Sequence, residues 1–114
     1  MIEILIPTFN RAEFLKKNIL DLNDKIVKSN LQEKFRILVS NNCSTDNTAD
    51  TLSEIERRVT VPLIIFHQKK NIGLEPNALF LLEKAAADYV MYLGDDDYLP
   101  EGYLEFIFDK TKNE

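Results

Sequence analysis

The chain has 114 residues and a formal net charge of -5, a length that suits one compact domain with a hydrophobic core and is too short for two. With 45% hydrophobic and 29% charged residues, the composition excludes an intrinsically disordered chain. Lysines and arginines are scattered along the sequence, which excludes the basic surface typical of proteins that bind nucleic acid. We therefore expect a single domain over residues 1–114 with no nucleic-acid partner.

The sequence carries no signal for secretion or membrane insertion. The single cysteine, Cys43, cannot form an internal disulfide, which fits a reducing compartment. Residues 1–7 lack the basic start of a signal peptide, and no apolar run approaches the roughly 18 residues needed to cross a bilayer. A cytoplasmic location is expected, with a place at the cytoplasmic face of the membrane as the other possibility.

Four short runs rich in β-branched and aromatic residues predict buried strands at residues 3–7, 35–40, 63–68 and 89–94. His67, the only histidine, falls in the third run and is interpreted as a packed or edge residue. The runs are separated by segments with the apolar spacing of helices. A further short helix around residues 103–108 precedes a polar tail at residues 110–114.

The three connecting helices each have an apolar stripe and a start signal. Asn10 with Glu13, residues 44–46, and Pro76 suit the first turns of the three helices in chain order. The expected stripes are Leu15, Ile19, Leu22 and Ile26 in the first, Ala49, Leu52, Ile55 and Val59 in the second, and Leu79, Leu82 and Ala86 in the third. Alternating strands and helices predict a doubly wound α/β fold, with a mostly parallel sheet of about four strands and flanking helices.

Ligands of such sheets bind beyond the carboxyl ends of the strands, where three segments of this chain stand out. Residues 7–11 (PTFNR) follow the first strand, residues 41–46 (NNCSTD) the second, and residues 94–97 (GDDD) the fourth. We expect all three to meet at one edge of the sheet. The adjacent carboxylates of Asp95, Asp96 and Asp97 repel one another, and a hard cation such as Mg²⁺ or Mn²⁺ would relieve that repulsion. The alternative is a solvated acidic turn that helps to start the next helix.

Four motifs, in this order and spacing, carry a resemblance to a known family: residues 4–11 (ILIPTFNR), 39–48 (VSNNCSTDNT), 71–73 (NIG) and 92–100 (YLGDDDYLP). Together they resemble the N-terminal, nucleotide-sugar-binding half of family 2 glycosyltransferases of the GT-A fold. The resemblance extends from residue 2 to about residue 108. It implies an inverting, metal-dependent transfer of a sugar from a nucleoside diphosphate sugar, with a UDP-sugar favoured, to a carbohydrate or lipid-linked acceptor.

The resemblance also implies roles for single residues. Pro7, Thr8 and Asn10 would border the nucleotide, although a helix cap is the alternative role of Asn10. Asn41 stands where the family usually has an aspartate that accepts the ring N–H of the base, so the choice of base stays open. Residues 71–73 would form the family's turn near the ribose and diphosphate, whereas the alternative is a turn in which Gly73 supplies only its left-handed conformation. Asn71 and Gly73 are therefore candidate nucleotide contacts.

In the acidic motif, the resemblance makes Asp96 the metal ligand and Asp97 an auxiliary ligand of Mn²⁺ or Mg²⁺, with Asp95 facing the ribose or the donor sugar. Gly94 stands where relatives often have an aspartate. The family's catalytic base lies in its C-terminal half, so we expect it beyond Glu114 and expect no catalytic residue within the chain. The fragment would bind the donor without turning it over, and its segment around residues 103–108 would promote self-association.

Two other functions share parts of this pattern. A nucleotidyltransferase would use a similar sheet and cation but should carry a glycine-rich, basic loop after the first strand, and residues 7–11 contain no glycine. A receiver-like signalling module also binds Mg²⁺, but its carboxylates follow the first and third strands. Here those positions hold Thr8 with Phe9, and Lys69 with Lys70.

Overall fold

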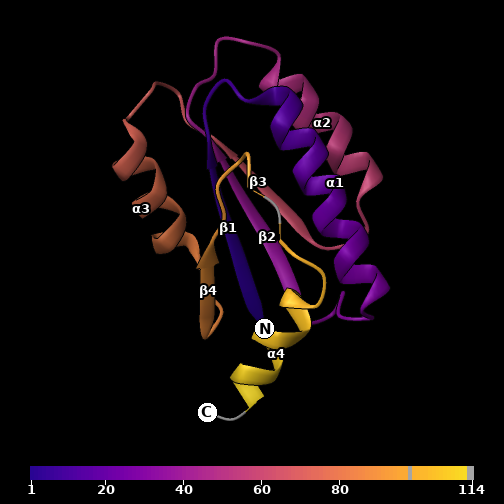
Figure 1. Ribbon diagram of the computed structural model, residues 1–114. Coiled ribbons are helices and arrows are strands. Elements are labelled where there is room, and N and C mark those ends of the chain that lie inside the picture. Colours follow the sequence, from indigo (N-terminus) through magenta and orange to yellow (C-terminus); the bar gives the residue numbers. More distant parts are fainter. Residues whose placement is uncertain (98, 113–114) are drawn as a thin grey trace.

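The computed structural model describes residues 1–97 and 99–112, and it shows a sheet with helices on both faces (Figure 1). Each expected strand and helix is present, so the predicted α/β fold is confirmed. In chain order the elements are β1 (Ile2–Thr8), α1 (Ala12–Lys28), β2 (Phe35–Asn41), α2 (Thr48–Arg58), β3 (Leu63–His67), α3 (Leu74–Lys84), β4 (Tyr89–Tyr92) and α4 (Tyr103–Lys112). The end of the expected polar tail, residues 113–114, lies outside the described residues.

The four strands lie in the order β3-β2-β1-β4, and each neighbouring pair is parallel. β1 pairs with β2 from Ile2 opposite Phe35 to Thr8 opposite Asn41. On its other side, β1 pairs with β4 only as far as Leu5 opposite Tyr92. Because the strands run in one direction, the loops after β1, β2 and β4 all leave the same edge, as expected.

The two faces of the sheet are covered unequally. α1 and α2 lie together on one face, and α3 lies on the other (Figure 1). The α1 stripe predicted from the sequence is confirmed, since its four residues are all buried in the larger core. In α2 only Leu52 and Ile55 of the predicted stripe are buried, whereas Ala49 is exposed and Val59 is partly buried just beyond the helix.

The predicted stripe of α3 is wrong. Leu79 and Leu82 are 56% and 44% exposed, and Ala86 lies beyond the end of the helix. The buried residues of α3 are Asn77 and Leu81. Asn77 is held by Ser40 of β2, because the Ser40 hydroxyl donates to Asn77 Oδ1 at 2.6 Å and Asn77 Nδ2 donates to the Ser40 carbonyl at 3.0 Å. A polar pair thus replaces apolar packing at this position, which a hydrophobic pattern does not reveal.

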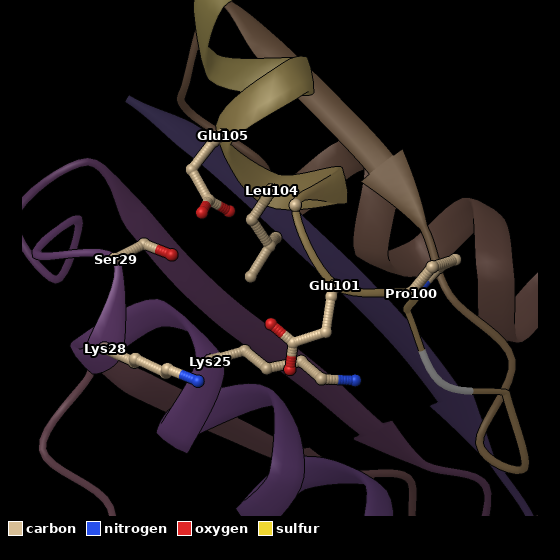
Figure 2. Close-up of a pocket in the computed structure, with 8 residues that line it drawn as sticks. Lys25, Lys28, Ser29, Pro100, Glu101, Leu104 and Glu105 are labelled. Atoms are coloured by element: carbon tan, nitrogen blue, oxygen red, sulfur yellow. The ribbon is translucent and has the colours of Figure 1, made fainter.

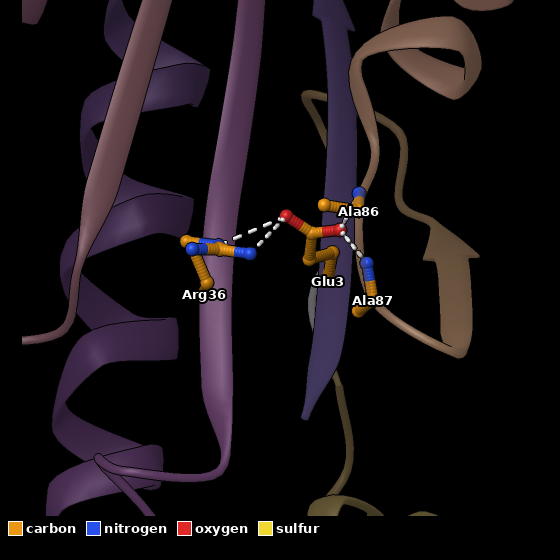
Figure 3. Close-up of polar contacts among 4 residues, drawn as sticks. All are labelled: Glu3, Arg36, Ala86 and Ala87. Carbon is orange, nitrogen blue, oxygen red and sulfur yellow. Dashed lines mark hydrogen bonds and ion pairs between the residues drawn. The ribbon is translucent and has the colours of Figure 1, made fainter.

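An ion pair between β1 and β2 supports the segment that leads into β4 (Figure 3). Glu3 is 1% exposed, and its Oε2 accepts from Arg36 Nε and Nη2 at 2.9 and 2.8 Å. Its Oε1 accepts from the main-chain N–H groups of Ala86 and Ala87 at 2.6 and 2.7 Å. Burial alone raises the pKa of the Glu3 carboxyl, but these two N–H groups and the Arg36 guanidinium outweigh it and hold the pKa below 4.5.

The fourth strand is shorter than predicted, because it ends at Tyr92. Leu93 still donates its N–H to the Leu5 carbonyl at 3.0 Å, but Asp97 then donates to the Gly94 carbonyl at 3.1 Å and closes a turn. The three aspartates therefore project beyond the edge of the sheet. Among the described residues, no helix is long and apolar enough to cross a membrane.

Candidate functional site

A cleft of about 370 Å³ lies at the carboxyl edge of the sheet. It brings together residues from the ends of β1 and β2, the loop before α3, the start of α3 and the segment after β4. The residues that line it are Pro7, Thr8, Phe9, Arg11, Asn42, Asn71, Leu74, Asn77, Gly94 and Asp95. Four of the predicted nucleotide-binding residues, Pro7, Thr8, Asn71 and Asp95, therefore share one cleft.

Thr8 and Asp95, which both line the cleft, are in direct contact. Thr8 Oγ1 donates to Asp95 Oδ2 at 2.9 Å, although the two residues are 87 positions apart in sequence. Burial raises the pKa of the Asp95 carboxyl above its ordinary value of 3.8; the Asp96 carboxylate acts in the same direction, whereas the Thr8 hydroxyl and the Arg11 guanidinium lower it. Asp95 is thus a half-buried carboxylate that is held in place by β1.

Asp96 and Asp97 are exposed and fold back over Gly94. A Cβ atom at position 94 would lie 2.5 Å from Asp97 Oδ2 and 3.4 Å from Asp96 Oδ1. The two carboxylates therefore converge on a space that exists because residue 94 has no side chain. Tyr98, which follows the three aspartates in the motif, lies outside the described residues.

This oxygen donor set fits a hard cation such as Mg²⁺ or Mn²⁺, which takes one or two protein carboxylates and completes its shell with water and phosphate oxygens. Within residues 1–97 and 99–112, no group of three or more His, Cys, Asp and Glu side chains is arranged to hold a metal by itself. A cation at Asp96 and Asp97 would therefore depend on ligands from the substrate.

Asn42 holds the predicted turn at residues 71–73, and the sequence reasoning did not single it out as a site residue. Its Oδ1 accepts from the Ile72 N–H at 2.9 Å, while its Nδ2 donates to Asn71 Oδ1 and to the Gly73 carbonyl at 3.1 and 3.2 Å. Gly73 has φ 93° and ψ 160°, an extended conformation with positive φ that is essentially restricted to glycine. The sequence signal that could have identified Asn42 is its position, because it immediately follows β2, whose carboxyl end lies at the cleft.

Asn10 links two loops and does not line the cleft. Its φ is 53°, and its Oδ1 accepts from the Thr45 N–H at 2.8 Å while its own N–H donates to Ser44 Oγ at 3.0 Å. The predicted cap at Asn10 is wrong, since α1 begins at Ala12 with Arg11 at its N-cap position and no side-chain cap bond. Ser44 and Thr45 are likewise engaged by Asn10 instead of capping α2.

Asp46 binds the first residue of α2, although the N-cap position of that helix is Asn47 and has no side-chain cap bond. Its Oδ1 accepts from the Thr48 N–H at 3.0 Å and from the Thr48 hydroxyl. Burial raises the pKa of Asp46, but the bonds from Thr48 and the N–H of Ala12 outweigh it and lower the pKa below its ordinary value.

Asn41 lies at the end of β2, buried and outside the lining of the cleft. Its Oδ1 accepts from the N–H and the hydroxyl of Ser44 at 3.1 and 2.6 Å, and its Nδ2 lies 3.2 Å from Nδ1 of His67. His67 is exposed on the edge strand β3, so its interpretation as an edge residue is confirmed. Contact between Asn41 and a base stays a prediction. It would require at least one of the two hydrogen bonds from Ser44 to Asn41 Oδ1 to break.

Arg11 and Leu74 complete the lining of the cleft. The Arg11 guanidinium lies 5.9 Å from the centre of the Phe14 ring, and it is the one cationic side chain in the described lining. Leu74, at the first position of α3, is 75% exposed. Nothing in the sequence pattern distinguishes either residue from an ordinary residue at the start of a helix.

A second hollow, of about 140 Å³, lies between the end of α1 and the start of α4 (Figure 2). Lys25 and Lys28 face Glu101 and Glu105 across it. None of the predicted site residues lines this hollow.

Known proteins are similar to this chain in sequence and in fold. The chain is 31% identical over 111 residues to the abequosyltransferase RfbV of Salmonella typhimurium, a match that covers 94% of this chain and 31% of that protein. The fold of the present chain superposes on that of S. aureus TarS in complex with UDP-GlcNAc. The TM-score is 0.84 at 18% identity, over 98% of this chain and 31% of TarS. The fold also resembles that of a mannosyltransferase from Pyrobaculum calidifontis in complex with GDP-Man and Mn²⁺, with a TM-score of 0.75 at 19% identity, over 87% of this chain and 28% of that protein.

The chain thus spans about a third of the length of the relatives that it matches. The sequence model described as Glycosyl transferase family 2 matches residues 3–114, which is nearly the whole chain. The protein therefore belongs to glycosyl transferase family 2.

Proposed function

We propose that the cleft binds a nucleoside diphosphate sugar, with a UDP-sugar favoured, as the donor in a sugar-transfer reaction. The observation that carries this proposal is the convergence of Thr8, Asn71 and Asp95 from three separate segments on one cleft. Two proteins of the same fold support it, since TarS is seen with UDP-GlcNAc and the Pyrobaculum enzyme with GDP-Man. Family membership favours sugar transfer over nucleotidyl transfer and over a receiver-like signalling role.

The cleft divides into a nucleoside part and a diphosphate part. Pro7 and Thr8 border the nucleoside, with Asn10 and Asn41 behind them toward the base. Asn71 and Gly73 lie at the ribose and diphosphate, where the bonds from Asn42 keep their turn in place. Arg11 supplies a positive charge for the phosphates, and Asp95 faces the ribose or the donor sugar.

Asp96 and Asp97 would hold Mn²⁺ or Mg²⁺ against the diphosphate, with Asp96 as the main ligand. When bound, the cation neutralises the charge that develops on the departing diphosphate. The protein's contribution is geometric: Thr8 fixes the Asp95 carboxylate, and Gly94 leaves room for the two exposed carboxylates to converge. The sugar passes with inversion to a hydroxyl of a carbohydrate or lipid-linked acceptor in the whole protein.

Calorimetric titration with UDP tests this assignment. We expect UDP to bind at least roughly tenfold more tightly with Mn²⁺ than with a chelator, which corresponds to about 1.4 kcal/mol. Asp96→Asn should remove most of this gain and Asp97→Asn a smaller part. Asp88→Asn is the matched control, because Asp88 is an exposed aspartate at the opposite end of β4. The same UDP affinity with and without Mn²⁺ in the wild type would contradict the metal assignment.

Parallel titrations with GDP and dTDP would identify the base. If GDP or dTDP bound more tightly than UDP, the preference for uridine would be wrong, while the donor cleft itself would stand.

The apolar surface near β4 supports self-association of the chain. Val90 and Tyr92 of this edge strand are 37% and 46% exposed, and Phe106 of α4 is 56% exposed. Ile107 and Phe108, which we also expected at this surface, pack partly against the core. Exposed edge strands with apolar side chains favour pairing with another chain. Sedimentation should show a mass that rises with concentration, and a monomer at all concentrations would exclude it.

A further inference from the structure

Helix α1 donates hydrogen bonds to two main-chain carbonyls, one in the acidic turn (residues 94–97) and one just after it. Asn18 Nδ2 donates to the carbonyl oxygen of Asp95 at 2.9 Å, and Lys25 Nζ donates to the carbonyl oxygen of Leu99. These two side chains are seven positions apart, which is close to two helical turns, so they project from the same face of α1. Lys25 extends from α1 toward the segment that contains Pro100 and Glu101 (Figure 2).

The remaining contacts of the turn fix its ends and leave its tip exposed. Leu93 and Leu99, on either side of the turn, are both buried in the larger core. Asp95 is held a second time, because its carboxylate accepts from Thr8. Asp96 and Asp97 are exposed between these fixed points, so the peptide of Asp95 sets the direction in which their carboxylates leave the chain.

We propose that Asn18 is a positioning residue for the cation and the diphosphate: it fixes the Asp95 carbonyl and thereby orients Asp96 and Asp97. This inference rests on the proposed function of the cleft. A loop that is ordered before the ligand arrives loses less conformational entropy on binding than one that the ligand has to order. The amide of Asn18 contributes to binding by this route without touching the ligand.

Position on the helix separates this role from an ordinary structural one. Asn23, on the same helix, is also an asparagine with partners in a distant segment. Its Oδ1 accepts from the N–H groups of Thr60 and Val61 at 3.1 and 3.0 Å. Those residues lie before β3, away from the acidic turn. Asn23→Ala is therefore a control that removes an amide side chain with long-range partners from the same helix, although Asn23 accepts hydrogen bonds where Asn18 donates one.

The first test compares the UDP affinity with Mn²⁺ and with a chelator in each variant. For Asn18→Ala we expect the Mn²⁺-dependent gain to fall by roughly tenfold, as for loss of an outer-shell partner, with UDP affinity in chelator unchanged. Asn23→Ala should lower the melting temperature, while the Mn²⁺-dependent gain in UDP affinity stays equal to that of the wild type. An unchanged gain in Asn18→Ala would overturn the proposal, as would an equal loss in Asn23→Ala.

A second readout needs neither the metal nor UDP. Hydrogen exchange of the Asp97 amide, which donates to the Gly94 carbonyl at 3.1 Å, reports the order of the turn directly. Asn18→Ala should speed this exchange, and Asn18→Asp should do so too, because it keeps the shape but loses the donor. Exchange at the wild-type rate in both variants would refute the positioning role. This result does not depend on whether the wild type binds UDP.

Discussion

Replacing Glu3 by glutamine should destabilise the fold in a pH-dependent manner. The glutamine carbonyl oxygen can still accept from the N–H groups of Ala86 and Ala87, but Arg36 loses its carboxylate partner. Hydrogen bonds to charged groups contribute about 1.5–3 kcal/mol, against about 0.5–1.5 kcal/mol for neutral ones. Because the Arg36 side chain is 30% exposed, water compensates part of the loss. We expect Glu3→Gln to lower the free energy of unfolding by about 2 kcal/mol near neutral pH.

The pH dependence follows from the pKa of Glu3. This pKa is held below 4.5 in the folded protein, so the stabilisation is fully present above about 4.5 and is lost as the pH falls through the folded pKa. The difference between the wild type and Glu3→Gln should therefore shrink in acid. Urea unfolding at several pH values measures it, with Glu33→Gln as a control at an exposed glutamate. If the free energies of unfolding of the wild type and Glu3→Gln were equal near neutral pH, or if their difference stayed constant into acid, this reasoning would be refuted.

Two further substitutions test the acidic turn. Gly94→Ala places a Cβ atom 2.5 Å from Asp97 Oδ2 and should displace that exposed carboxylate, so we expect a loss of roughly tenfold in Mn²⁺-dependent UDP affinity with little change in melting temperature; calorimetry and a thermal melt check both. Asp95→Asn removes a carboxylate whose pKa is raised by burial. The ligand-free domain should therefore melt at a higher temperature than the wild type near neutral pH, but not in acid. UDP binding should weaken. A lower melting temperature for this variant near neutral pH would contradict the direction of that pKa shift.

The fold was predictable because apolar periodicity and the alternation of strands with helices reflect burial directly. The stripe of α1 is an example, since its four apolar residues all enter the core. The pattern failed at α3, where Asn77 is 1% exposed and Leu79 is 56% exposed. A helix that buries a polar residue against Ser40 gives no apolar signal, and only the partner strand reveals why the asparagine is inside.

The site was predictable in outline and not in detail. The rule that ligands bind at the carboxyl edge of a parallel sheet places Thr8 and Asp95 together, and the structure confirms that they are in contact. The roles of Asn18, Asn42 and Arg11 depend on which distant segment each side chain meets, and spacing along the chain carries no such information. Asn10 and Asn41 show the same limit, because both are engaged by the loop at residues 44–46.

One cleft at the carboxyl edge of the sheet is proposed to hold the donor nucleotide, with a cation at the acidic turn. A crystal structure of the protein soaked with UDP and Mn²⁺, with the anomalous signal of manganese recorded, would locate both. We predict the nucleotide between Thr8 and Asn71, and a manganese peak between Asp96 and the diphosphate. UDP bound elsewhere, such as in the hollow between α1 and α4, or manganese away from residues 95–97, would show that the proposed site is wrong.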